Sequence, residues 1–289
     1  MGRKQRILYQ GQELLLATTD LVFKALLTAD GDLELLASLL SCILDLDIAP
    51  DDVTVTNSEL PQTHEKGKLA RVDVRVKLAD GKHINVEMQV ADDHNIAKRS
   101  IFYLSKLYVD QLKPSMNYEE ICPAIAINIL DFDFLPFEEY HNVYRLKNIK
   151  SHHELTDAYE INFIELKKVP TETRTCLKEK WMLFIAADSA EMLDKLANEE
   201  PIMEKALKKL QYVSSDDQLR YELDMRQKAE LDYGSAMVAN YKRGRAEGET
   251  TGRLRATTEL ARKLKASAAM SDDEIAKLCD LPIEEVENL

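Results

Sequence analysis

The chain has 289 residues, of which 45% are hydrophobic and 31% are charged, and its formal net charge is −13. This composition is typical of a globular protein with one large or two modest domains. The acidic balance argues against a broad surface that coats nucleic acid, but it is compatible with a local nucleic-acid site.

No segment of the sequence has an apolar run long enough to span a bilayer, and the N-terminal stretch lacks the pattern of a secretory signal. The cysteines are scattered without the paired spacing of a zinc site. We therefore expect a cytoplasmic protein with reduced thiols and no membrane partner.

Two helices are expected near the start of the chain. Asp20 precedes the apolar-periodic segment LVFKALL, and its carboxylate can cap a helix that begins there. Residues 33–46 are apolar on most sides, which predicts a buried helix. Pro50, Asp51 and Asp52 then break the chain, and residues 53–60 are expected to form a first strand.

A β-hairpin is the clearest local prediction. The runs RVDVRVKL (71–78) and INVEMQV (84–90) alternate apolar and polar residues, and Asp80-Gly81 between them is a turn signal. The two apolar faces coincide only if the loop has three residues, 79–81, so that paired residue numbers sum to an even value. Gly81 then occupies the left-handed third position of the loop.

This register has a consequence for the polar face of the hairpin. Asp73 falls opposite Glu87, with Gln89 two residues further on the same face. Two acids directly opposite each other repel. A neighbouring cation or a bound hard metal ion could offset the repulsion, whereas the alternative is a solvated face of mixed charge. The cations on this face are Arg71, Arg75 and Lys77.

The rest of the chain continues the pattern and then becomes helical. We expect a helix over residues 91–112 and a strand buried on both faces at 123–131. Short strands follow at 140–146 and 159–166. From residue 175 the pattern is helical, with one long charged helix to about Lys265.

Charge is uneven along the C-terminal region. Residues 241–265 carry eight basic residues against three glutamates, whereas residues 266–289 carry seven acids against one lysine. The first stretch could contact phosphates or simply solvate a helix. In the second, Ser271 with Glu274 fits a capping box and Pro282 suits a helix start. Its acidity favours packing or self-association over DNA contact.

The order of elements predicts an α/β fold in which a mixed β-sheet has helices on its faces, followed by a helical C-terminal region. Three parts are expected: a domain at 1–170, a helical region at 171–265 and a short helix-turn-helix-like tail at 266–289.

The hairpin residues and the element order resemble the PD-(D/E)XK nuclease superfamily, whose fold is restriction-endonuclease-like. Asp73 fits the first acidic position and Glu87-Met88-Gln89 the second motif. Gln89 stands where many relatives have lysine. Within the superfamily, the chain is most similar to the Rpn branch of recombination-promoting nucleases, which also carries a transposase label. The segment TTDLVFKALL resembles the opening of that branch through Asp20, Phe23 and Lys24.

The resemblance implies a metal site and a substrate. Mg²⁺ or another divalent cation would be held by Asp73, Glu87 and the backbone carbonyl of Met88, with Gln89 orienting the attacking water. Asp20 and Lys24 would support the site. The substrate would be DNA, contacted by Arg71, Arg99, Tyr103 and Lys106.

Three functions remain open on the sequence alone. The first is a Mg²⁺-dependent DNA endonuclease tied to recombination or mobile elements. The second is a catalytically weak or inactive nuclease-fold protein that acts in DNA binding or regulation. The third is an interaction protein whose long helices drive assembly. A homodimer through the C-terminal helices is compatible with each of them.

Overall fold

The structure, a computed structural model, describes residues 6–56, 74–92, 94–171 and 176–289. It divides into two compact units, Met1–Leu223 and Asp224–Leu289. The three-part division expected from the sequence stays a prediction. Among the described residues, every helix is too short or too polar to cross a membrane.

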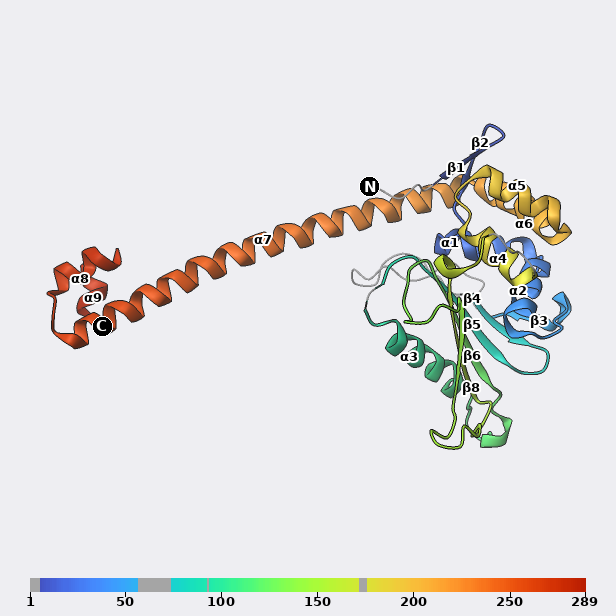
Figure 1. Cartoon of the computed structure of the whole chain (residues 1–289), viewed down its shortest axis with the longest axis horizontal. Helices are drawn as coiled ribbons and strands as arrows, with labels where there is room; N and C mark the ends of the chain where they lie inside the picture. The colour runs from blue at the N-terminus through green and yellow to red at the C-terminus, as the bar shows by residue number, and fades with distance from the viewer. Residues whose placement is uncertain (1–5, 57–73, 93, 172–175) are drawn as a thin grey trace. The chain divides into compact units, whose positions relative to one another are not determined.

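A mixed six-stranded sheet in the first unit confirms the predicted fold class (Figure 1). The strand order is β3-β4-β5-β6-β8-β7. The neighbours β5, β6 and β8 are parallel, and the other pairings are antiparallel. The strands are β3 (Val53–Val55), β4 (Val74–Leu78), β5 (His83–Gln89), β6 (Ala124–Leu130), β7 (His141–Arg145) and β8 (Tyr159–Glu165).

The β4–β5 hairpin has the register that alternation predicts. Val74 pairs with Val86 and Lys77 with His83, so paired numbers sum to 160. Gly81 has φ 93°, the left-handed conformation expected at the third loop position. The amide of Leu78 donates to the carbonyl of Lys82 at 2.9 Å and closes the three-residue loop. The apolar residues of both strands therefore face the same side.

A second hairpin, not anticipated from the sequence, precedes the sheet. It joins β1 (Arg6–Tyr9) to β2 (Gln12–Leu15) in an antiparallel pair. The two loop residues, Gln10 and Gly11, have φ 46° and 85°, which is the backbone of a tight two-residue hairpin turn. Gln-Gly is a weaker turn signal than Asn-Gly or Asp-Gly, so the short alternating run around it does not by itself predict a hairpin.

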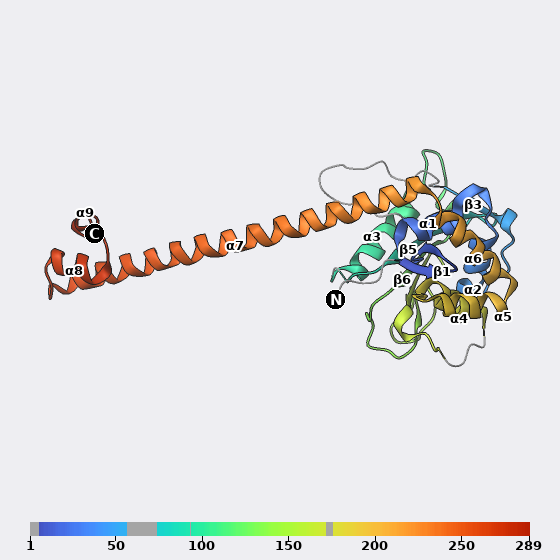
Figure 2. The ribbon, with the colours of Figure 1, turned by 90° about the horizontal axis from the view of Figure 1, so that it is seen from above.

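Helices cover the two faces of the sheet differently (Figures 1 and 2). Of the helices that the structure describes, α3 (Ile96–Val109) covers one face, where it contacts β5, β6 and β8. The opposite face is covered by α1 (Asp20–Thr28), α2 (Glu34–Leu44) and α4 (Leu177–Ala186), with α5 (Ala190–Glu199) and α6 (Pro201–Ser214) packed outside them. The described residues of this unit also form short 3₁₀ helices: η1 (Ala29–Gly31), η2 (Pro50–Asp52), η3 (Tyr118–Glu120) and η4 (Leu166–Lys168).

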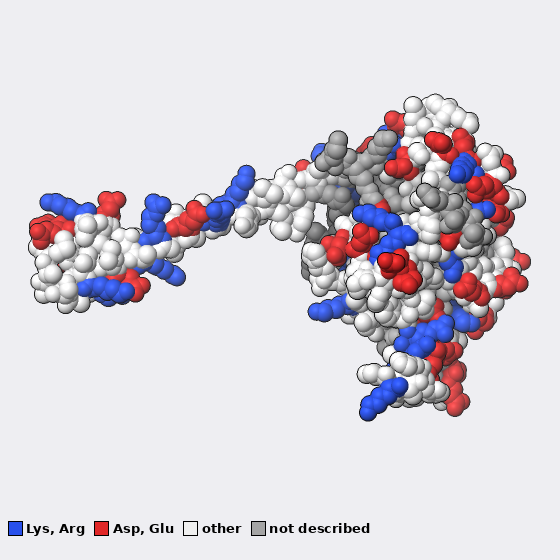
Figure 3. Space-filling view, viewed as in Figure 1, with Lys and Arg blue, Asp and Glu red and all other residues white. Residues whose placement is uncertain are grey.

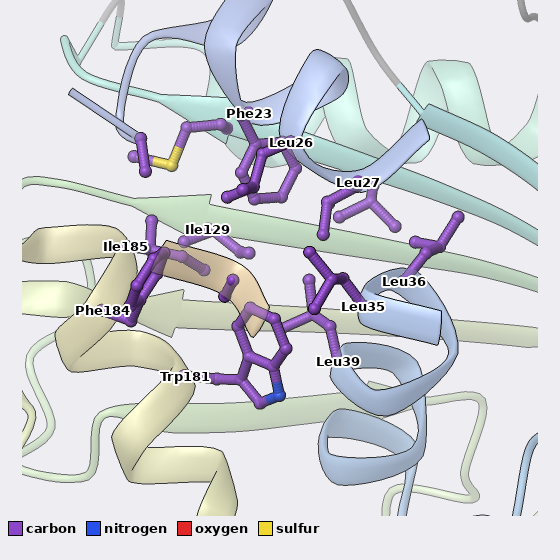
Figure 4. Packing of buried hydrophobic residues seen from close by; sticks show 14 of the residues in the cluster. Phe23, Leu26, Leu27, Leu35, Leu36, Leu39, Ile129, Trp181, Phe184 and Ile185 are labelled. Atoms are coloured by element: carbon purple, nitrogen blue, oxygen red, sulfur yellow. The ribbon is translucent and has the colours of Figure 1, made fainter. Parts of the chain in front are cut away.

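The main core lies between the sheet and the helices α1, α2 and α4 (Figure 4). Phe23 of α1, Leu35 of α2 and Trp181 of α4 all point into this core. Trp181 is fully buried, makes an edge contact with Phe184 and donates its indole N–H to Oγ of Ser38 at 3.0 Å. The single polar atom of the indole is thereby satisfied, so the ring can be buried at little cost.

On the other face, α3 is held by smaller apolar contacts and by a buried hydrogen bond. Ile96 and Leu104 pack onto the sheet. Between them, Asn128 of β6 donates its amide to Oγ of Ser100 at 2.9 Å. Buried side chains at positions 96, 100 and 104 are spaced by one helical turn, which fixes the rotation of α3 on the sheet.

The second unit is helical and contains the distal part of α7 (Asp217–Ser267), α8 (Asp272–Cys279) and α9 (Ile283–Glu287). Ile275, Leu281 and Val286 pack against Ala261 of α7. The capping box is confirmed, because the amide of Ser271 donates to Oε2 of Glu274 at 2.9 Å. Elsewhere, α7 is polar and carries ion pairs four residues apart, which support an exposed helix.

Candidate active site

One strand presents a row of polar side chains on the α3 face of the sheet. In β5, Ile84, Val86 and Met88 point into the main core, so the intervening residues face α3. Those residues are His83, Asn85, Glu87 and Gln89. The alternation seen in the sequence therefore places the predicted acid on the polar side.

Glu87 is the centre of a hydrogen-bonded network. Its Oε2 accepts from Nε2 of Gln89 at 2.7 Å and pairs with Nη2 of Arg99 at 3.3 Å. Its Oε1 accepts from Nδ2 of Asn85 at 3.3 Å. The carboxylate side chain is 12% exposed. Three donors thus fix the orientation of the Glu87 carboxylate, which stays partly exposed to solvent.

The rotation of α3 determines which of its polar residues reaches the site. Arg99 precedes the buried Ser100 and is half-buried beside Glu87. Tyr103 and Lys106 follow at four and seven residues, on the same stripe but exposed to solvent, with Tyr103 38% exposed. Tyr103 also makes an edge contact with Phe102. One of the three predicted DNA-contacting residues of α3 therefore touches the acid, and two lie on the surface.

α1 contributes the two residues that were predicted to support the site. This helix contacts β5. The predicted capping role of Asp20 is wrong, because Thr19 is the N-cap residue of α1 and Asp20 is already the first residue of the helix. Oδ1 of Asp20 accepts the amide of its neighbour Leu21 at 2.8 Å, and the negative charge in the first turn suits the helix dipole. Lys24 is 2% exposed, which is unusual for an ammonium group and requires that its charge be compensated.

Two predicted site residues, Arg71 and Asp73, lie outside the residues that the structure describes. The described β4–β5 ladder begins with Val74 opposite Val86, directly before Glu87 on β5. The expected juxtaposition of Asp73 with Glu87 stays a prediction. Within the described part of the chain, no three His, Cys, Asp or Glu side chains cluster as metal ligands.

The donor set present is nevertheless of the kind that a hard cation takes. Glu87 offers a carboxylate, and Met88 could offer only its backbone carbonyl, because its side chain is buried in the core. Oδ1 of Asn85 is buried and has no hydrogen-bond partner in the described structure. Mg²⁺ takes oxygen ligands, retains several waters and needs one or two carboxylates. These residues fit such an ion if one further acid joins them.

A model of the PD-(D/E)XK nuclease family transposase matches residues 17–240. The chain belongs to this family. The match includes the whole six-stranded sheet, α3 and the first part of α7, so it confirms the resemblance inferred from the sequence. Neither a curated protein nor a solved structure gave a significant match. Family membership establishes a nuclease fold, and the reaction of this chain is a separate question.

Asn85 is the site residue that sequence reasoning overlooked. The signal was available, since Asn85 lies two residues before Glu87 and alternation puts both on one face. An asparagine has no charge to attract attention in a strand of mixed polarity. Its importance follows only from burial and from the contact with Glu87.

Proposed function

We propose that this protein is a metal-dependent DNA endonuclease that hydrolyses phosphodiester bonds in recombination or mobile-element biology. The observation that supports it best is the oriented carboxylate of Glu87, held by Gln89 and Arg99 on the polar face of β5. In the matched family, this strand carries the second acidic motif. The position of this network on β5 supports the assignment of Glu87 as the second acid of the proposed site.

Asp73, Glu87 and the carbonyl of Met88 would hold the cation. When bound, a divalent cation stabilises charge on the phosphate and makes a water nucleophilic near neutral pH. Glu87 contributes an anionic oxygen whose direction is set by Gln89 and Asn85. Asp73 would contribute the second carboxylate from the adjoining segment.

Gln89 and Arg99 divide the tasks that one lysine performs in many relatives. The amide of Gln89 cannot supply positive charge, and its Nε2 donates to Glu87. The guanidinium of Arg99, 3.3 Å from the same carboxylate, supplies a permanent cation beside the site. Lys24 would add a second positive charge. In this proposal Gln89 positions the acid, and the cations stabilise the developing negative charge.

DNA would approach along the exposed stripe of α3. Tyr103 and Lys106 continue that stripe beyond Arg99, and Arg71 would join them from the neighbouring strand segment. The face of the protein in Figure 3 carries groups of basic side chains separated by acidic and uncharged ones. A short contact with a few phosphates fits this surface and the net charge of −13 better than extensive wrapping does. Two copies joined through their C-terminal helices would allow both strands to be cut.

The test is cleavage of supercoiled plasmid in Mg²⁺ by the wild type, Asp73→Ala and Glu87→Ala. The proposal expects nicking by the wild type, inhibition by a chelator, and loss by more than about 100-fold in both variants, because losing a direct ligand should exceed the effect of an outer-shell change. Lys98→Ala, on the exposed side of α3, is the control and should cut normally. Equal cleavage by the wild type and Asp73→Ala would overturn the metal assignment.

One observation favours a second function. Gln89 stands where many relatives have a lysine, and its uncharged amide donates to Glu87. If the site lacks sufficient positive charge, the protein would bind DNA or regulate a relative without cutting efficiently. The same plasmid distinguishes the two functions. A gel shift without nicking supports the binding role, whereas chelator-sensitive nicking supports the endonuclease.

A further inference from the structure

Asn85 has an unusual hydrogen-bonding state next to the proposed site. It is 6% exposed, and Oδ1 is fully buried with no hydrogen-bond partner among the described residues. Buried polar atoms in folded proteins nearly always have a partner, from the protein, a water or a ligand. An orphaned oxygen two residues from Glu87 therefore indicates that something else hydrogen-bonds there.

The orphan is the oxygen and not the nitrogen of the amide. Nδ2 lies 3.3 Å from Oε1 of Glu87, and a carboxylate oxygen accepts hydrogen bonds. Rotating the amide by half a turn would bring two oxygens together and leave the nitrogen unsatisfied instead. The contact with Glu87 thus determines that Oδ1 points away from that carboxylate.

The strand neighbours of Asn85 do not hydrogen-bond its oxygen in the described structure. Its lateral partner on β6 is Ala126, whose side chain ends in a methyl group. Its partner on β4 is Arg75, which offers donors and no side-chain acceptor. Glu87 follows on the same face. Because Oδ1 is closed off from bulk solvent, a donor that reaches it would have to be a molecule bound at the site.

We propose that Asn85 is a positioning residue of the metal site, acting at both ends of its amide. Nδ2 orients Glu87, and Oδ1 accepts a hydrogen bond from a water belonging to a hydrated divalent cation held at Glu87. This inference rests on the proposed function, since it deepens the metal assignment. Mg²⁺ keeps several of its waters when it binds to proteins, so an amide oxygen can hold the ion indirectly.

The experiment measures metal binding directly, by calorimetric titration of the full chain with Mg²⁺ and with Mn²⁺. Asn85→Ala removes both the donor and the acceptor. Asn85→Asp keeps the acceptor but replaces the donor by a carboxylate oxygen, which repels Glu87 in the metal-free protein and is stabilised when a cation binds. Asn142→Ala, on the edge strand β7, is the matched control. We expect Asn85→Ala to weaken binding by about 10-fold or more, Asn85→Asp to retain binding within about threefold of the wild type, and Asn142→Ala to match it.

Plasmid kinetics give the second readout. Asn85→Ala should lower kcat and leave KM for plasmid unchanged, because Asn85 faces the cation and not the DNA. Melting temperatures of the metal-free variants identify a purely structural role. If both Asn85 variants lose metal binding together with metal-free stability, or if both bind metal like the wild type, the inference is wrong.

These outcomes are separable from those of the proposed function. Wild-type protein that binds Mg²⁺ through Asn85 and Glu87 but leaves plasmid intact would support the inference and overturn the endonuclease. If the wild-type protein cuts plasmid and Asn85→Ala binds metal as tightly as the wild type does, the endonuclease function is supported and the role of Asn85 is overturned.

Discussion

Arg99 of α3 places Nη2 3.3 Å from Oε2 of Glu87 on β5. The two residues belong to different layers of the fold, so their contact depends on the rotation of α3, which Ser100 and Asn128 fix from beneath. The pair is partly exposed on both sides, with 22% and 12% of the side chains accessible. Such a pair can open to admit a cation, because its guanidinium can turn to solvent or to a phosphate.

Replacing Arg99 by alanine should reduce plasmid cleavage by about 10-fold or more while changing stability little. The cation beside the site is lost, whereas a partly exposed ion pair contributes only about 1 kcal/mol or less to folding. Cleavage rates and urea unfolding of Arg99→Ala and Lys98→Ala would check this, the second variant serving as control. A normal rate for Arg99→Ala would exclude Arg99 from the site.

Gln89→Lys should raise kcat by about 10-fold or more. Lysine would bring a positive charge to within reach of Glu87 and of the developing charge on the phosphate, where the amide offers only dipoles. Gln89→Ala should lower kcat, because Glu87 loses its shortest hydrogen bond, of 2.7 Å. Single-turnover cleavage of one plasmid by the three proteins measures both effects. A lysine variant no faster than the wild type would mean that missing charge does not limit the reaction.

Alternation in the hairpin was sufficient to predict on which face of the sheet Glu87 lies. A period of two assigns each residue to a face, and the need to match apolar faces selects a three-residue loop with Gly81 at its third position. Both steps use only neighbours in sequence. The same reasoning placed Arg99, Tyr103 and Lys106 on one stripe of a helix, as the structure also has them.

The contacts that join these segments could not be predicted in the same way. Whether Arg99 or Tyr103 meets Glu87 depends on how α3 rotates on the sheet, and that rotation follows from Ser100 meeting Asn128, 28 positions later in the chain. The donors on Glu87 depend equally on side-chain rotamers, which a pattern of polarity does not specify. Alternation does put Asn85 on the face of Glu87, but its contact with that carboxylate depends on the rotamers of both side chains.

Leu35→Ala should lower the free energy of unfolding by about 2–5 kcal/mol. Leu35 is 1% exposed and points into the main core, so truncation leaves a cavity (Figure 4). Trp181 is the single tryptophan of the chain, and its fluorescence therefore reports unfolding of this core alone. Leu46→Ala, at a leucine 39% exposed, is the control and should stay within about 0.5 kcal/mol of the wild type.

Because of His141, we expect the first unit to be less stable in mild acid than at neutral pH. Burial lowers the pKa of His141 from its ordinary value of 6.5, although its hydrogen bond with Asn162 acts in the opposite direction. At a pH between the lowered pKa of folded His141 and 6.5, this histidine is protonated in the unfolded chain but not in the folded protein. The stabilisation is therefore complete above pH 6.5 and is lost as pH falls toward the folded-state pKa.

His141→Gln removes this titration while keeping an N–H that can donate to Oδ1 of Asn162, which lies 2.8 Å from Nε2 of the histidine. Urea unfolding at pH 8 and pH 5.5, followed by the fluorescence of Trp181, should show a smaller loss of stability in the variant than in the wild type. His152→Gln, at an exposed histidine, should behave as the wild type does. Carboxylates that titrate in all three proteins cancel in the comparison. An equal loss in the wild type and His141→Gln would show that His141 takes up its proton as readily when folded as when unfolded.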